Sequence, residues 1–129
     1  MSNAHALIID DNAKNVSVLA GLLNLEGVSS TQVTDPRKLD AALNSLQALN
    51  VIFLDLEMPG LNGYEVLEKI HADPRFEGVP VVAYTVHVSE INVANEQGFH
   101  SFIGKPLNPD KFPEQLNRIL NGEPVWETT

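Results

Sequence analysis

The stretch ALIIDDNAKN, residues 6–15, decides the fold prediction. Residues 7–9 form a continuous apolar run, which is typical of a short strand buried on both faces of a parallel sheet. Two adjacent carboxylates, Asp10 and Asp11, follow this run directly. Because neighbouring carboxylates repel each other and lose hydration on burial, we expect a cation beside them.

The rest of the chain alternates strand patterns with helix patterns. Further strands are predicted at 28–33, 51–55, 80–85 and 101–106, and helical patterns lie within 12–27, 35–46, 63–72, 89–98 and 108–120. Five such units predict a doubly wound α/β domain, a parallel sheet with helices on both faces, because crossovers between parallel strands are right-handed. We expect a single domain over residues 1–129, with its core in 6–120 and a short tail in 121–129.

Composition narrows the possible functions. The 129 residues include 17 acidic and 8 basic side chains, for a net charge of -9. This balance argues against nucleic-acid binding and against an anionic membrane surface, both of which need a basic patch. No cysteine is present, which excludes disulfides and zinc–thiolate sites. No apolar run approaches the ~18 residues of a membrane span, and no signal peptide is recognisable, so we expect a cytoplasmic protein.

Polar residues fall where the predicted strands end. Asp10 and Asp11, Asp55, Thr85 and Lys105 follow or close the first, third, fourth and fifth strands. Those ends meet at the ligand crevice of an open α/β sheet. Three carboxylates there favour a hard cation held by oxygen ligands, Mg²⁺ with Mn²⁺ as an alternative, rather than zinc. A lysine and a hydroxyl opposite such a metal can hold a phosphoryl group, which a carboxylate can accept covalently.

The chain resembles the receiver domain of bacterial response regulators, the phospho-acceptor module of two-component signalling. The resemblance runs from Leu7 to Leu120 and rests on IDDN, LDLEMPGLNG, YT and GKP in that order. It implies a flavodoxin-like fold with strand order 2-1-3-4-5 and five helices, as in single-domain chemotaxis regulators. It also implies these roles: phosphorylation of Asp55; Mg²⁺ binding by Asp10, Asp11, Asp55 and the backbone carbonyl of Glu57; phosphate binding by Lys105; and a switch formed by Thr85 and Phe102.

The resemblance further implies the partners. A histidine kinase or phosphotransfer protein would supply the phosphoryl group, and a downstream protein would bind the surface of the fourth helix, fifth strand and fifth helix. The Lys105–Pro106 bond would be cis. The protein would catalyse only its own phosphorylation and dephosphorylation.

Three residues near the predicted site depart from the common pattern or occupy variable positions. Val86 stands where the family usually has alanine or another small residue, and Glu57 and His87 occupy positions that tune phosphoryl lifetime. We expect Val86 to obstruct access to Asp55 and Glu57 to repel an anionic donor, with a protonated His87 partly offsetting that charge.

One other class uses a similar set of residues. Aspartyl-phosphate hydrolases of the haloacid-dehalogenase type pair a nucleophilic aspartate with a second acid two residues on, as in Asp55-Leu56-Glu57. In those enzymes, however, the nucleophile strand comes first and the acid pair last, whereas here the acid pair comes first. A flavodoxin is excluded because no Ser/Thr/Gly-rich phosphate loop follows the first strand.

Overall fold

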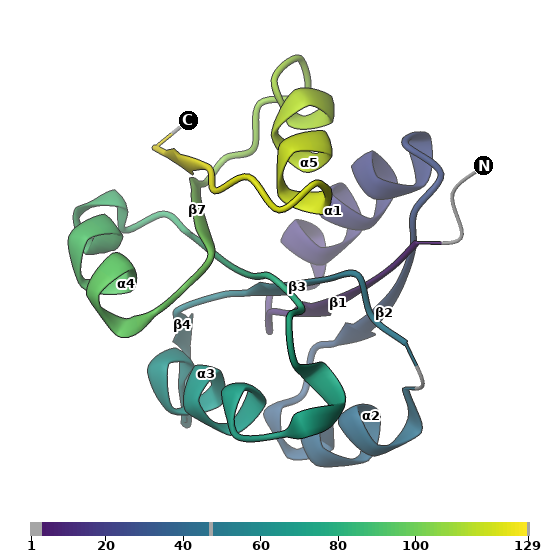
Figure 1. Cartoon of the computed structure of the whole chain (residues 1–129), viewed down its shortest axis with the longest axis vertical. Coiled ribbons are helices and arrows are strands. Elements are labelled where there is room, and N and C mark those ends of the chain that lie inside the picture. The colour runs from purple at the N-terminus through teal and green to yellow at the C-terminus, as the bar shows by residue number, and fades with distance from the viewer. Residues whose placement is uncertain (1–3, 47, 129) are drawn as a thin grey trace.

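In the computed structural model, which describes residues 4–46 and 48–128, a parallel sheet lies between two layers of helices (Figure 1). The outermost residues of the expected domain, 1–3 and 129, lie outside this range. The sheet order is β2-β1-β3-β6-β7-β8, and every pair of neighbours is parallel. Its strands are β1 (His5–Ile9), β2 (Ser29–Val33), β3 (Val51–Leu54), β6 (Val81–Thr85), β7 (Ser101–Gly104) and β8 (Trp126–Glu127). The predicted order 2-1-3-4-5 is therefore confirmed for the first five of these strands.

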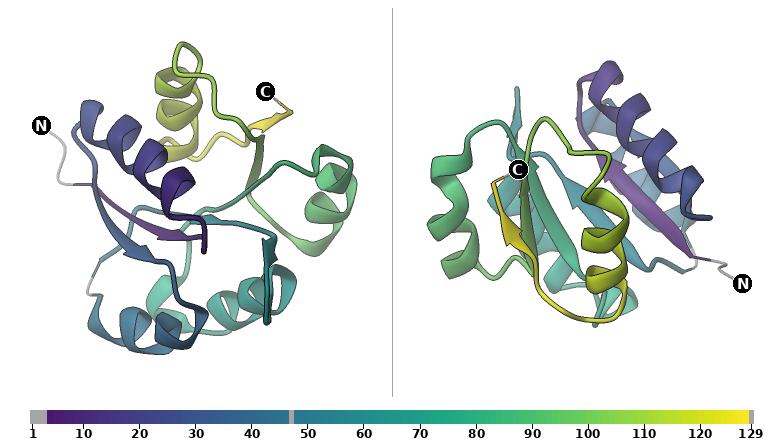
Figure 2. Two further views of the ribbon diagram at one scale, coloured as in Figure 1. Left: turned by 180° about the vertical axis from the view of Figure 1, so that it is seen from behind. Right: turned by 90° about the horizontal axis from the view of Figure 1, so that it is seen from above.

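Five α-helices connect the strands: α1 (Ala13–Leu25), α2 (Leu39–Ser45), α3 (Gly63–His71), α4 (Ile91–Gln97) and α5 (Phe112–Leu120). Short 3₁₀ turns η1 (Pro36–Lys38), η2 (Pro74–Phe76) and η3 (Val88–Glu90) precede or follow them. Helices α1 and α5 cover one face of the sheet, and α2, α3 and α4 cover the other (Figures 1 and 2). No helix among the described residues is both long and apolar enough to cross a bilayer.

The sheet divides the core into two apolar layers. Alternate residues of one strand enter opposite layers: Phe53 packs with α1 and α5, and Leu54 packs with α2 and α3. All four residues of β3 are fully buried. This explains its unbroken apolar sequence, since no face of the strand meets water.

Capping residues in the sequence explain several of the helix ends. The Asn12 side chain caps α1 by accepting a hydrogen bond from the Asn15 amide at 3.1 Å. Gly98 closes α4 with φ of 98°, a left-handed conformation that glycine adopts without strain. Ser89, the first residue of the predicted helical segment 89–98, instead lies inside η3, and α4 begins after Glu90 without a side-chain cap. The Lys105–Pro106 bond is cis, as predicted.

Two short strand features were not predicted. Residues Glu57–Met58 (β4) and Leu61–Asn62 (β5) form an antiparallel hairpin directly after the third sheet strand. Residues Trp126–Glu127 (β8) add a sixth strand beside β7. The short tail expected to follow the core 6–120 therefore contributes a strand to the sheet.

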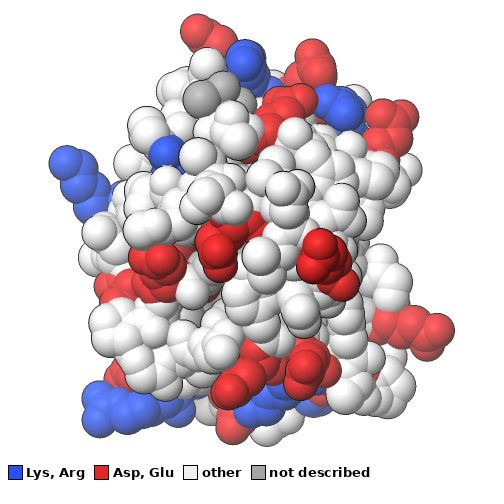
Figure 3. Space-filling view, turned by 90° about the vertical axis from the view of Figure 1, so that its left-hand side faces the viewer, with Lys and Arg blue, Asp and Glu red and all other residues white. Residues whose placement is uncertain are grey.

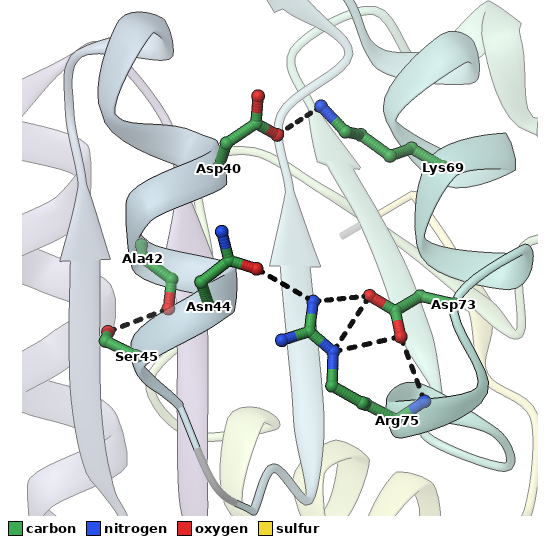
Figure 4. Close-up of polar contacts among 7 residues, drawn as sticks. All are labelled: Asp40, Ala42, Asn44, Ser45, Lys69, Asp73 and Arg75. Atoms are coloured by element: carbon green, nitrogen blue, oxygen red, sulfur yellow. Dashed lines mark hydrogen bonds and ion pairs between the residues drawn. The ribbon is translucent and has the colours of Figure 1, made fainter.

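Polar bridges link α2 to the segment that contains α3 and η2 (Figure 4). Lys69 on α3 pairs with Asp40 on α2. Arg75 pairs with Asp73 and also donates to Asn44 on α2 at 3.1 Å. These contacts are largely exposed to solvent, so each contributes little to stability.

Candidate phosphoryl and metal site

Four strand ends bring the predicted site residues together. Asp10 follows β1, Asp55 follows β3, Thr85 ends β6 and Lys105 follows β7. The Lys105 ammonium lies 3.0 Å from an oxygen of Asp10 and 3.5 Å from an oxygen of Asp55. Residues 20 to 95 positions apart in the sequence thus meet in one crevice because parallel strands end at the same edge of the sheet.

Three carboxylates at this edge form a group suited to a cation. Asp10, Asp11 and Asp55 each offer an oxygen, and these three oxygens lie within 4.8 Å of one another. Asp10 and Asp55 are buried, whereas Asp11 is exposed and can turn toward an ion from the solvent side. An all-oxygen set of this kind fits Mg²⁺ or Mn²⁺.

The two buried carboxylates have opposite pKa shifts. Burial disfavours the charged form of Asp10, but hydrogen bonds from the Asn12 amide, Lys105 and Tyr84 outweigh it, so the pKa of Asp10 lies below its usual value. Burial raises the pKa of Asp55 to about 6, and Asp10 adds to the rise while Lys105 opposes it. Asp55 is therefore the carboxyl with most to gain from an added positive charge.

Tyr84 is a member of the site that the sequence prediction missed. Its hydroxyl donates to Asp10 Oδ2 at 2.8 Å, and the Lys105 ammonium lies 4.3 Å from the centre of its ring. The side chain is buried, and its pKa is raised by burial and by Asp10. The sequence did contain an indication of this role, since Tyr84 interrupts an otherwise apolar strand and a buried phenol needs a hydrogen-bond partner.

The predicted switch residues occupy two neighbouring strands. Thr85 is fully buried, and its hydroxyl oxygen accepts a hydrogen bond from the His87 amide at 3.2 Å. Phe102 on β7 is also fully buried, in the core layer that contains Ala94 and Phe99. The Phe102 side chain therefore lies in the interior of the protein in this structure.

The three residues expected to tune rates lie near the mouth of the site. Glu57 and His87 form a direct contact, with a carboxylate oxygen 2.7 Å from the imidazole Nε2. This contact joins β4 to the loop after β6. Val86, between Thr85 and His87, is 61% exposed.

The chain as a whole matches a known family. Residues 6–117 match the model of the response regulator receiver domain. The chain belongs to this family. The rice two-component response regulator ORR5 (Oryza sativa subsp. japonica) is 29% identical over 118 residues, which cover 90% of this chain and 88% of the rice protein. The DNA-binding response regulator MtrA of Mycobacterium tuberculosis is 31% identical, over 88% of this chain and 49% of its own length.

Solved receiver structures share the fold. Chemotaxis protein CheY4 of Vibrio cholerae superposes with a TM-score of 0.81 at 22% identity, over 92% of this chain and 99% of that one. The receiver domain of the sensor histidine kinase PA1611 from Pseudomonas aeruginosa superposes with a TM-score of 0.80 at 22% identity, over 93% of this chain and 99% of that one. That crystal structure holds a magnesium ion in its active site cleft.

Proposed function

We propose that this receiver domain accepts a phosphoryl group on Asp55 in a Mg²⁺-dependent reaction. The observation that carries the proposal is the convergence of buried Asp55 with Lys105 and two further carboxylates at one edge of the sheet. A purely structural lysine would need only one buried acid as its partner. Here three acids lie close together, and one of them, Asp11, is exposed to solvent.

Each residue has a separate task in this proposal. A carboxylate oxygen of Asp55 attacks phosphorus, and the bond to the donor's leaving atom breaks. The Glu57 amide, 3.1 Å from Asp55 Oδ1, fixes the orientation of the acceptor. Lys105 and Thr85 bind the oxygens of the arriving group.

Asp10, Asp11, Asp55 and the Glu57 carbonyl would hold Mg²⁺, with Mn²⁺ as an alternative. The ion would neutralise the acids and the phosphoryl oxygens, which is the main requirement of phosphoryl transfer. The donor would be a histidine kinase or a phosphotransfer protein, and the output surface would be formed by α4, β7 and α5.

Incubation with Mg²⁺ and acetyl phosphate tests the acceptor. Intact-protein mass spectrometry should show one added phosphoryl group, and Asp55→Asn should abolish it. Asp110→Asn, which changes an exposed acid outside the site, should be labelled like the unmodified protein. Full labelling of Asp55→Asn would refute the assignment, and sustained hydrolysis of phosphate esters would favour the dehalogenase-type reaction instead.

A further inference from the structure

The β7 edge of the sheet is covered by the chain's own C-terminal segment, residues 125–128 (Figures 1 and 2). The Phe102 amide donates to the Val125 carbonyl at 2.7 Å. Trp126 and Glu127 then pair in parallel with Phe102 and Ile103. The segment thus lies along the middle strand of the surface assigned above to a downstream partner.

Side chains also hold the segment on α5. Glu127 accepts hydrogen bonds from Gln115 at 2.8 Å and from Arg118 at 3.3 Å. Val125 is fully buried in the core layer of α1 and α5, and Trp126 packs against the opposite layer. Burial of Val125 therefore holds the start of the segment in place, whereas the strand beyond it pairs with β7 over only two residues.

The segment contacts a glycine that lies next to a residue of the phosphorylation site. Gly104 pairs with Thr85 in the sheet and directly precedes Lys105. A Cβ atom on Gly104 would lie only 2.0 Å from the carbonyl oxygen of Thr128. Of the two switch residues, Phe102 lies on the strand next to the segment, and Thr85 lies on the strand after that.

We propose that residues 126–128 form a detachable edge strand, which is docked in the unphosphorylated protein and released when Asp55 carries a phosphoryl group. This inference rests on the proposed function, because it names the regulation of the same site. Release would expose the β7 edge to an extended segment of a partner protein, which would add to the sheet in place of Trp126 and Glu127.

The strand order gives the direction of the effect. Asp55 follows β3, and β6 and β7 lie between β3 and β8. A phosphoryl group on Asp55 that draws Thr85 and Lys105 toward itself therefore pulls the ends of β6 and β7 away from β8. Because Gly104 and Thr128 meet with no side chain between them, that movement weakens the docking of the segment directly.

The surroundings of this edge indicate the chemistry of the partner. Val86 and Val88, between β6 and α4, and Val93 on α4 are exposed apolar side chains. On the face that carries α4, acidic side chains lie near the centre among uncharged residues, and basic side chains lie toward the margins (Figure 3). On the α5 side, Gln115 and Arg118 bind an acid. The edge therefore fits an extended peptide in which an aromatic residue precedes an acidic one.

Trp126 is the only tryptophan in the chain, so its emission reports docking. Addition of Mg²⁺ and beryllofluoride to the full chain should shift the Trp126 emission to longer wavelength. Hydrogen exchange of the Phe102 amide should accelerate by at least about fivefold, the lower end of typical coupling between sites. Backbone NMR shifts at Asp55 and Glu57 would report binding of the mimic independently.

Two variants test the coupling in the reverse direction. Gly104→Ala should displace the segment, and Gly21→Ala, whose added methyl meets nothing within 4 Å, is its control. Because Gly104 adjoins Lys105, Glu127→Ala provides a second release variant, with Glu114→Ala, which removes another acid near Arg118, as control. By reciprocity, both release variants should bind beryllofluoride more tightly, and the controls should not.

A labelled peptide EPVWETT tests the partner chemistry. It should bind the beryllofluoride-loaded protein more tightly than the unliganded protein, and its Trp→Ala form should bind weakly to both. Shifts at Asp55 without any change at Trp126 or Phe102 would overturn the release mechanism and leave the proposed function intact. Absence of shifts at Asp55 would overturn both, and equal binding of the two peptides would overturn the aromatic–acidic specificity.

Discussion

Asp55 retains its proton to higher pH in the folded protein than in the unfolded chain. Its pKa is raised from 3.8 to about 6, chiefly by burial. The native state therefore binds this proton more tightly, and its contribution to stability is lost as pH rises from about 4 to 6. In metal-free solution, Asp55→Asn should remove this pH dependence and raise the free energy of unfolding at pH 7 by up to about 3 kcal/mol.

Urea unfolding between pH 4 and 7 measures this effect. The difference between Asp55→Asn and the unmodified protein should be small near pH 4 and largest near pH 7. Asp110→Asn, at an exposed position, should follow the unmodified protein at every pH. A constant difference across the range would show that packing, rather than ionisation, distinguishes the Asn variant.

Tyr84 acts on the site through the groups that it contacts. Tyr84→Phe keeps the ring beside Lys105 but removes the hydroxyl that donates to Asp10. Because Asp10 would lose a charge-assisted hydrogen bond that orients it, we expect Mg²⁺ binding to weaken by about 1 kcal/mol, roughly fivefold in Kd. Calorimetric titration with Mg²⁺ measures this change.

A second tyrosine provides the matched control for this substitution. The Tyr64 hydroxyl donates to Glu90 at 3.0 Å, a pair that includes none of the site acids. Tyr64→Phe should therefore leave the Mg²⁺ affinity unchanged, while Tyr84→Leu, which also removes the ring, should reduce it further than Tyr84→Phe. Equal affinities for Tyr84→Phe and the unmodified protein would show that Asp10 is oriented without the phenol.

At the level of elements, the contact between Glu57 and His87 joins the hairpin β4–β5 to the loop after β6. Glu57→Asn removes a negative charge near the approach to Asp55 and opens this contact. We expect phosphorylation by acetyl phosphate to accelerate severalfold, and more at low salt than at high salt because exposed charges are screened. Glu96→Asn, on exposed α4, is a charge-matched control.

Val86 tests the steric part of the same prediction. Val86→Ala should accelerate both phosphorylation and dephosphorylation if its branched side chain obstructs the approach to Asp55. Because the Val86 side chain is 61% exposed, the substitution should cost little stability. Unchanged rates with an unchanged melting temperature would remove access as the limiting factor.

The sequence predicted those elements whose pattern is local and long enough to read. Strands β1, β3 and β6 consist mainly of consecutive apolar residues, and their ends place Asp10, Asp55 and Thr85 at one edge. Strand β8 contains only Trp126 and Glu127, too few residues to show a period, and its pairing depends on how α5 directs the chain back to β7. The Tyr84–Asp10 bond joins residues 74 positions apart, so only the fold reveals it.

For the whole molecule, electrostatic repulsion is concentrated at the site and also spread over the surface. The net charge of -9 disfavours the compact state at low ionic strength, and any salt reduces this effect. A divalent ion held by Asp10, Asp11 and Asp55 would act differently, because it binds the native arrangement specifically. Comparison of MgCl₂ with NaCl at equal ionic strength separates the two contributions.

Mg²⁺ should therefore raise the melting temperature beyond the effect of NaCl at matched ionic strength. A severalfold excess over Kd corresponds to about 1 kcal/mol of stabilisation, since the ion binds only the native state. Asp11→Asn should weaken the Mg²⁺ response and raise the metal-free stability, because it removes one of the repelling charges, whereas Asp110→Asn should retain the full response. The response should also decline below pH 6, where Asp55 becomes protonated and protons compete with the metal. A melting temperature that responds equally to MgCl₂ and NaCl would mean that the three acids do not bind the ion, and that relief of general charge repulsion accounts for the whole effect.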